Sequence, residues 1–363
     1  MKKRRILYLV PHRMGRSPGQ RFRCEHFIPF LKESGYEITY SNILSTWDDK
    51  HFYSHRNYII KLFIVIKSFI KRIRDIIRVK NYDAVFIYRE AFMLGTVFFE
   101  RTIKWLKVPI IFDFDDSIWL NDTSQGNQSL RWLKRPSKTA DICKLATTVI
   151  VGNSYLAQYA KQYAKNVFII PTTIDTDYHK PMEKTIENKD SVIIGWTGTS
   201  TTLKHLATIQ STLSDLKKRY GDKVKFKIIA DLSPEIEGVE FEFVKWNLEN
   251  EIEQLSHFDI GIMPLPDNQW ARGKCGFKGL QYMALEIPSV MSPVGVNNDI
   301  ITNGKNGYLA STDQEWFNIL SMLIENPELR LKIGKEGRKT VFEKFSVKNN
   351  NLNYLKIVDG TTK

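Results

Sequence analysis

Two series of short apolar runs, separated by helical patterns, constrain the fold of this chain most strongly. The first series lies at residues 6–10, 37–41, 83–88, 109–113, 147–151 and 167–170, and the second at 191–195, 224–230, 241–244 and 259–263. Apolar runs that alternate with helices are typical of parallel sheets covered on both faces. We therefore predict an α/β protein with two Rossmann-like, doubly wound parallel-sheet domains that face a cleft.

The chain length supports two domains, because 363 residues exceed the size of one typical core. A polar, proline-punctuated segment at 171–181 separates the two series. We predict a first domain at 1–172, a linker at 173–190, a second domain at 191–340 and a charged C-terminal helix at 341–363.

The formal net charge of +13 calls for an anionic partner, such as nucleic acid, an anionic membrane or a phosphorylated ligand. No nucleic-acid recognition module is evident, so we expect no nucleic-acid partner. Three widely spaced cysteines indicate a reducing compartment, and we expect the protein in the cytoplasm. The apolar run at 6–10 is too short for a secretory signal.

The second series contains two glycine-rich turns between a strand and a helix. Lys274, Gly276 and Lys278 follow the run at 259–263. Gly198, Thr199 and Lys204 follow the run at 191–195. A helix start offers unpaired N–H groups to an anion, and glycine lets a ligand approach the backbone. The two turns could hold one diphosphate, although solvated lysines on helix surfaces are the simpler alternative.

The first series contains a basic loop and an acidic strand end. Arg13, Arg16, Arg21 and Arg23 follow the first strand, and arginine suits phosphate. The loop has no GxGxxG, which argues against a nicotinamide or flavin enzyme. Asp113, Asp115 and Asp116 end the strand at 109–113. We favour a catalytic or substrate-orienting role for these carboxylates over a metal site.

The segment 58–80 reads as a basic amphipathic helix. Its apolar stripe comprises Ile59, Leu62, Phe63, Ile66, Ile70, Ile73 and Ile77, and its basic residues Lys67, Lys71, Arg72, Arg74 and Arg78 lie mostly away from that stripe. Such helices bind anionic membranes. The alternative is a helix whose stripe packs on the first sheet with its lysines merely solvated, and both can hold at once.

Three segments together resemble the retaining nucleotide-sugar glycosyltransferases of family 4, bacterial cell-envelope polysaccharide type. They are 167–175 (VFIIPTTID), 194–198 (IGWTG) and 259–288, which ends in Met-Ala-x-x-x-Pro. The resemblance runs over nearly the whole chain. It implies the GT-B fold, a nucleotide diphosphate sugar bound in the cleft, no required metal or other cofactor, and a final helix that crosses back to the first domain.

The resemblance also assigns residues. Lys204 corresponds to the family lysine that neutralises phosphate, Gly276 to the glycine beside the diphosphate, and Gln281 to a glutamate that grips ribose. Asp115 falls on the place of a catalytic histidine and Asp116 on the neighbouring acid. Lys274 or Lys278 takes the place of a missing arginine. The residues expected to bind the nucleotide-sugar donor also include some that flank these positions or belong to the basic loop, namely Gly15, Arg21, Gly198, Thr199 and Phe277.

The expected activity is transfer of a sugar, with retention of its anomeric configuration, to a hydroxyl of a glycan or lipid-linked glycan acceptor. Asp115, Asp116, Lys204 and Lys278 are the predicted catalytic residues. The acceptor would enter near Gly15, Arg21 and Arg23, and the segment 58–80 would hold the enzyme on the inner face of the cytoplasmic membrane. The alternative is a non-catalytic subunit that binds a nucleotide sugar and assists another transferase, because a glutamate and a histidine of the family pattern are missing.

Overall fold

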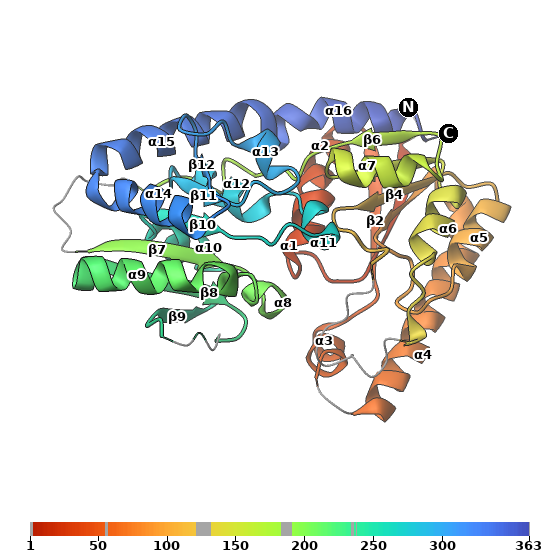
Figure 1. The fold of residues 1–363 in the computed structure, drawn as a ribbon. Helices are drawn as coiled ribbons and strands as arrows, with labels where there is room; N and C mark the ends of the chain where they lie inside the picture. Colours follow the sequence, from red (N-terminus) through yellow and green to blue (C-terminus); the bar gives the residue numbers. More distant parts are fainter. Residues whose placement is uncertain are drawn as a thin grey trace. The chain divides into compact units, whose positions relative to one another are not determined.

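The computed structural model describes residues 3–54, 57–120, 132–182, 191–233, 236 and 238–362. The chain divides into two compact units (Figure 1). The first comprises Met1–Thr173 and Asn350–Lys363, and the second comprises Ile174–Asn349. Of the predicted linker, residues 183–190 lie outside the described residues.

The first unit is built on a six-stranded sheet in the order β2-β1-β3-β4-β5-β6, with every neighbouring pair parallel. The bounds are β1 Arg4–Val10, β2 Tyr36–Asn42, β3 Ala84–Tyr88, β4 Ile110–Phe114, β5 Thr148–Val151 and β6 Val167–Ile169. Strands β1, β3 and β4 are almost entirely buried, as expected of a sheet covered on both faces. The strand order changes direction between β1 and β3, which makes a switch point there.

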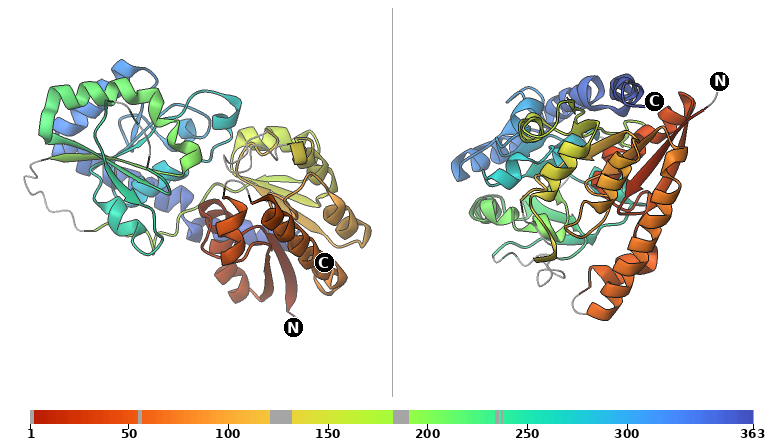
Figure 2. Two further views of the ribbon diagram at one scale, coloured as in Figure 1. Left: turned by 90° about the horizontal axis from the view of Figure 1, so that it is seen from below. Right: turned by 90° about the vertical axis from the view of Figure 1, so that its right-hand side faces the viewer.

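The second unit has a six-stranded parallel sheet in the order β12-β11-β10-β7-β8-β9. Figure 2 shows the ribbon from two further sides. The bounds are β7 Val192–Thr197, β8 Val224–Ala230, β9 Glu242–Lys245, β10 Ile260–Met263, β11 Ser289–Met291 and β12 Tyr308–Leu309. The direction reverses between β7 and β10. The two sheets confirm the predicted α/β class.

Helices connect the strands of both sheets. Those of the first unit are α1 Pro18–Arg23, α2 Ile28–Glu33, α3 Thr46–Phe52, α4 Tyr58–Ile77, α5 Phe98–Trp105, α6 Lys138–Leu145 and α7 Ser154–Lys161. Those of the second are α8 Ser200–Leu203, α9 Gln210–Tyr220, α10 Glu251–Ser256, α11 Gln269–Arg272, α12 Phe277–Ala284, α13 Asn297–Ile300, α14 Asp313–Glu325 and α15 Pro327–Thr340. The last helix, α16 Val347–Asp359, begins in the second unit and ends in the first.

The second sheet separates two apolar cores, as the alternation of side chains along a strand requires. Ile228 packs in a large cluster with Leu213 of α9 and Leu320 of α14. The next residue, Ile229, packs in a smaller cluster with Tyr282 of α12. Because both faces are filled, the ligand-accessible parts of this sheet are the ends of its strands.

One of the two sequence interpretations packs the apolar stripe of α4 on the first sheet, but the structure turns this stripe away from the sheet. The side chains that α4 buries are Lys61, Ile64, Ser68, Arg72 and Asp75. Its predicted apolar stripe lies on the solvent side, with Ile59 85%, Leu62 60% and Ile77 78% exposed. Packing of this stripe on the sheet is therefore wrong, and so is the placement of Arg72 on a solvated basic face.

A polar anchor explains this orientation. The fully buried Arg72 side chain donates to the carbonyl oxygens of Val10, Ser41 and Ala91, and it pairs with Asp75 at 2.8 Å. These carbonyls lie at or just beyond the strand ends of the sheet. One guanidinium thus satisfies several buried acceptors, and α4 docks through charge and hydrogen bonds instead of through its apolar arc.

Candidate functional site

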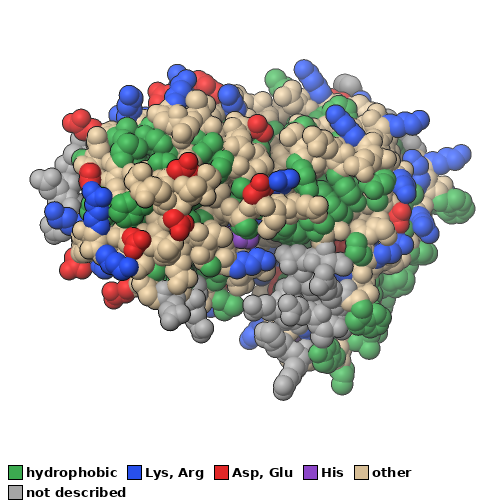
Figure 3. All heavy atoms as spheres, in the orientation of Figure 1, with side chains coloured by type: hydrophobic (Ala, Val, Ile, Leu, Met, Phe, Trp, Pro, Cys, Tyr) green, Lys and Arg blue, Asp and Glu red, His purple; other side chains and the backbone are tan. Residues whose placement is uncertain are grey.

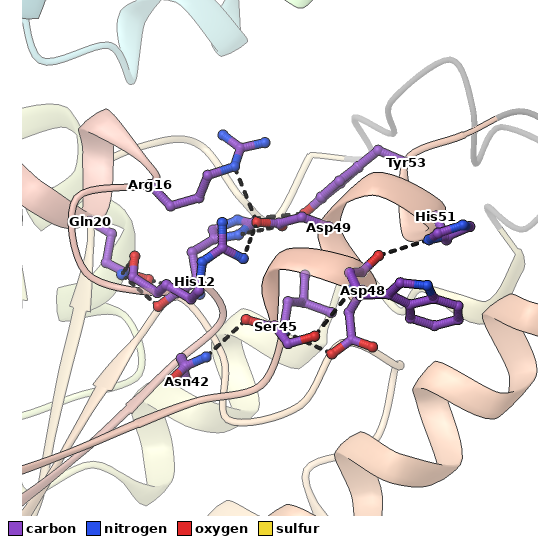
Figure 4. A network of polar contacts seen from close by, with 12 residues as sticks. His12, Arg16, Gln20, Asn42, Ser45, Asp48, Asp49, His51 and Tyr53 are labelled. Carbon is purple, nitrogen blue, oxygen red and sulfur yellow. Dashed lines mark hydrogen bonds and ion pairs between the residues drawn. The ribbon is translucent and has the colours of Figure 1, made fainter. Parts of the chain in front are cut away.

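The loop that follows β1 forms a network of polar contacts around Asp49 of α3 (Figure 4). Arg13 Nη1 lies 2.8 Å and Arg16 Nε 3.2 Å from Asp49 Oδ2, and His12 Nδ1 lies 3.4 Å from Asp49 Oδ1. Burial opposes ionisation of Asp49, but His12 and the two guanidinium groups outweigh it and lower the pKa of its carboxyl. The aspartate therefore fixes two arginines at the carboxyl end of β1.

Gln20 and Glu25 hold the backbone of the same loop. Gln20 exchanges hydrogen bonds with the main chain of His12, and its amide also donates to Glu25 at 2.7 Å. The N–H of Gly15 donates to the other oxygen of Glu25 at 2.7 Å, and Gly15 has a φ of 75°. Gly15 is thus a turn residue whose N–H is bound within the first unit, and its role toward the donor stays a prediction.

Arg23 is not available to a ligand, which corrects the expectation that it meets the acceptor. Its side chain and that of Asp113 are both fully buried, and the guanidinium binds both carboxylate oxygens, at 3.1 and 2.7 Å. It also donates to the carbonyl of Ile170. Asp113 therefore neutralises Arg23 in the core, and neither acts in a site. Arg21 is also buried, with its guanidinium over the ring of Phe22.

Asp115 and Asp116 lie at the end of β4 and share one arginine. Arg89 Nη2 is 2.7 Å from Asp115 Oδ1 and 2.6 Å from Asp116 Oδ2, and the hydroxyl of Tyr88 donates to Asp115 at 2.9 Å. Arg89 has a φ of 60°, an unusual conformation for a residue with a side chain. These contacts orient Asp115 at the carboxyl end of the sheet.

Gly19 of α1 packs against the same group. A Cβ atom at this position would lie 2.5 Å from the hydroxyl of Tyr88 and 2.9 Å from Asp115 Oδ2. Tyr88, Arg89 and Gly19 were not predicted as site residues. Tyr88 is the last residue of the buried strand β3 and Arg89 directly follows it, which is the one signal that could have marked them.

In the second unit, the predicted lysines gather at the switch point between β7 and β10. Lys278 Nζ lies 5.3 Å from the ring centre of Trp196 in β7, and Lys274 Nζ lies 5.0 Å from that of Trp270. These lysines also affect the pKa of His205. Burial, followed by the charges of Lys278, Lys274 and Lys204, lowers its pKa to about 4. Three ammonium groups therefore act on one imidazole, which sequence analysis did not single out.

Gly198 and Thr199 form the turn into α8. A Cβ at Gly198 would lie 2.3 Å from Trp196 and 2.8 Å from the Lys278 side chain, so only glycine fits beside the lysine. Thr199 caps α8 in a capping box with Thr202. The N–H of Ser200 already donates to Asp231 at 2.6 Å. In this conformation a carboxylate, which sequence analysis also missed, occupies the start of α8.

Gly276 and Gln281 belong to the start and the middle of α12. Gly276 precedes the helix with a φ of 68°, and a Cβ there would lie 2.2 Å from Ile300, so glycine is required. Phe277 is the first residue of α12 and is half-buried. Gln281 is buried, with its amide nitrogen 3.4 Å from both His179 and Glu251. Its role toward ribose stays a prediction.

Two properties of the described residues bear on the class of site. They contain no group of three or more His, Cys, Asp or Glu side chains arranged to hold a metal ion. None of the helices among them is long and apolar enough to cross a membrane.

Comparison with known protein families gives a match within the second unit. Residues 191–326 match the family model described as glycosyl transferases group 1. The match covers less than half of the chain, and the matched residues include Lys204, Lys274 and Lys278. No curated protein is similar enough in sequence to match the chain.

Solved structures match over nearly the whole chain. A glycosyltransferase from Rickettsia africae is 16% identical with a TM-score of 0.65, and the match covers 99% of each chain. Sucrose-phosphate synthase from Thermosynechococcus elongatus is 12% identical with a TM-score of 0.69 and 99% coverage of each chain. Anabaena HepE in complex with UDP-glucose is 13% identical with a TM-score of 0.65, covering 98% of this chain and 99% of that one. The GT-B fold and the glycosyltransferase class predicted from sequence are confirmed.

Proposed function

We propose that the chain is a retaining family-4 glycosyltransferase that moves a sugar from a nucleotide diphosphate sugar to a hydroxyl of a glycan or lipid-linked glycan. Its place would be the synthesis of bacterial surface polysaccharide. The observation that carries the proposal is the position of Lys278 beside Trp196 and Gly198, at the switch point of the second sheet, where its charge and those of Lys274 and Lys204 lower the pKa of His205.

The positive charge of the three lysines suits the leaving group of the reaction, which is the nucleoside diphosphate. Breaking the glycosyl bond places negative charge on the departing diphosphate, and cations fixed in advance stabilise this charge more than they stabilise the intact donor. Lys204 and Lys278 would supply the main charge, and Lys274 would add to it. The turns at Gly198 and Gly276, where no side chain fits, would let the diphosphate approach the backbone. Anabaena HepE, which shares the fold, was solved with UDP-glucose.

The first unit would position the acceptor. Asp115 would accept a hydrogen bond from the attacking hydroxyl or steady positive charge on the sugar, while Arg89 and Tyr88 hold its carboxylate in place. Asp116 would act with it through the same arginine. This gives the two units separate tasks, donor binding in the second and acceptor activation in the first.

We further propose that no metal is required, because three ammonium groups can neutralise the diphosphate. The test is transfer in excess EDTA, which should proceed at the rate measured with added Mg²⁺. A loss of transfer that Mg²⁺ restores would contradict this part of the proposal.

We also propose that α4 rests on the anionic inner face of the cytoplasmic membrane. Figure 3 shows apolar side chains along the edge where α4 lies in Figure 1. The exposed members on α4 include Ile59, Leu62, Phe63, Ile66 and Ile70. The exposed cations Lys67, Arg74 and Arg78 border this arc on one side. An apolar arc with a basic border suits the boundary between acyl chains and anionic headgroups.

Vesicle binding tests this part of the proposal. Phe63→Gln with Ile70→Gln removes two half-exposed side chains and should weaken partition into anionic vesicles by about 2–3 kcal/mol, or roughly 30- to 150-fold. Leu352→Gln, at an exposed position of α16, is the matched control and should bind like the wild type. Equal binding by both variants would remove α4 from the membrane contact.

The central test of the function is turnover. Lys204→Ala with Lys278→Ala should lower kcat/KM for donor hydrolysis or transfer by at least about a hundredfold, because two charges on the leaving group are lost. An unchanged kcat/KM would exclude these lysines from the mechanism. If the wild type binds nucleotide sugars but forms no product with any acceptor, even with membrane extract present, the non-catalytic alternative holds.

A further inference from the structure

The first unit contains a largely apolar pocket of about 380 Å³ at the carboxyl ends of β1, β2 and β3. Pro11 follows β1, Ile43 and Leu44 follow β2, and Met93 follows β3. Helix α4 closes one wall with Leu62 and Val65. The pocket lies at the switch point of the sheet, where α/β folds bind ligands, and its size is that of a small-ligand site.

One end of the pocket meets the polar network around Asp49. Tyr53 lines the pocket, and its hydroxyl lies 3.5 Å from His12 Nε2. Next to His12, Arg13 and Arg16 each contact Asp49 through one nitrogen. Figure 4 shows the outer nitrogens of Arg16 turned away from Asp49. Both arginine side chains are partly exposed, at 32% and 44%.

The charges of this network favour an anion. Two guanidinium groups face one carboxylate, so a net positive charge remains beside the pocket. Glu90, which also lines the pocket, is paired with Lys138 at 2.8 Å and does not cancel this charge. Guanidinium groups held in place by a carboxylate are well suited to bind phosphate through paired hydrogen bonds.

The other end of the pocket adjoins the apolar face of α4. Tyr58 and Leu62 line the pocket and are also 53% and 60% exposed on that face. A hydrocarbon chain could therefore run from the outer face of α4 into the pocket past Tyr58 and Leu62. Apolar walls next to two fixed guanidinium groups match an amphiphile with an anionic head.

We propose that this pocket binds the hydrocarbon chain of a lipid phosphate, with the phosphate against Arg13 and Arg16. The inference rests on the proposed function, since it names the lipid part of the acceptor as a chain that carries a phosphate or diphosphate. It gives the two arginines a binding role toward the acceptor in place of Arg23, which is buried.

Calorimetry with the full chain and dodecyl phosphate, kept below its micelle concentration, tests the proposal. Dodecyl phosphate should bind with saturation and at least tenfold more tightly than either inorganic phosphate or a neutral dodecyl glucoside. Arg13→Gln with Arg16→Gln should reduce its affinity to that of the glucoside. Leu62→Gln with Val65→Gln should weaken it at least tenfold. Ile77→Gln, exposed on α4 but outside the pocket, is the control and should bind as the wild type does.

Equal affinity for dodecyl phosphate and dodecyl glucoside, or wild-type affinity in either pair of variants, would overturn the proposal. If the arginine pair does not fold, the single variant Arg16→Gln at its partly exposed position must weaken binding at least threefold. Titration of the wild type with nucleoside diphosphates separates the two claims. Lipid phosphate binding without nucleotide binding supports the pocket and rejects the proposed function, and the reverse result rejects the pocket alone.

Discussion

Arg72 is the residue on which the orientation of α4 depends, and its removal gives the sharpest structural prediction. Arg72→Leu leaves the carbonyls of Val10, Ser41 and Ala91 without this donor and removes a buried partner of Asp75. Breaking a buried charge pair by removing one partner costs about 3–5 kcal/mol. Asp75 keeps Arg78 at 2.6 Å, so we expect the lower half of this range, about 3–4 kcal/mol of unfolding free energy.

The assay is native-state hydrogen exchange of the first unit, followed at the amides of β1 and β2, because exchange reports each unit separately. Arg74→Leu is the matched control, since Arg74 lies two residues away on α4 and is exposed. It should change the free energy of opening by no more than about 0.5 kcal/mol. An Arg72→Leu variant within 1 kcal/mol of the wild type would refute the polar anchoring of α4.

Three further predictions concern the two sites. Gly276→Ala should weaken nucleoside diphosphate binding and lower the melting temperature, because φ is 68° and the new methyl group would strike Ile300; a wild-type Kd and Tm would contradict this. His205 has a pKa of about 4 in the folded chain and about 6.5 when unfolded, so only the unfolded chain gains a proton between these values. The contribution of His205 to stability should therefore be full above pH 6.5 and fall by roughly 3 kcal/mol as the pH drops to 4, a loss that urea titrations of His205→Gln should not show. Gly19→Ala should displace Asp115 and slow transfer by roughly ten- to a hundredfold while leaving the Kd for the nucleotide unchanged, and unaltered kcat would argue against a role for Asp115.

The strands were the most predictable part of the fold. Buried parallel strands read as continuous apolar runs, and each of the ten predicted runs overlaps a strand of the structure. The strands β11 and β12, which have three and two residues, were not among the predicted runs.

Side-chain partners that are distant in the sequence were the least predictable. Arg23 resembled a loop cation, but its partner Asp113 is 90 residues away. Amphipathicity predicted the two arcs of α4 but not which arc faces the sheet. That choice depends on backbone carbonyls at strand ends, which carry no sequence signal. The lysine positions could be predicted from the sequence, whereas only the fold brings His205 near the lysines and Asp231 to the start of α8.

The proposed function depends most on the lysine cluster as the binding site for a diphosphate. Calorimetric titration of the wild type with uridine, guanosine, thymidine and cytidine diphosphates tests this directly. At least one should bind, and Lys204→Ala with Lys278→Ala should weaken that affinity by at least about a hundredfold, since each charge-assisted hydrogen bond contributes about 1.5–3 kcal/mol. Lys332→Ala, at an exposed position of α15, should bind as the wild type does. Equal affinity in the double variant and the wild type would contradict the account.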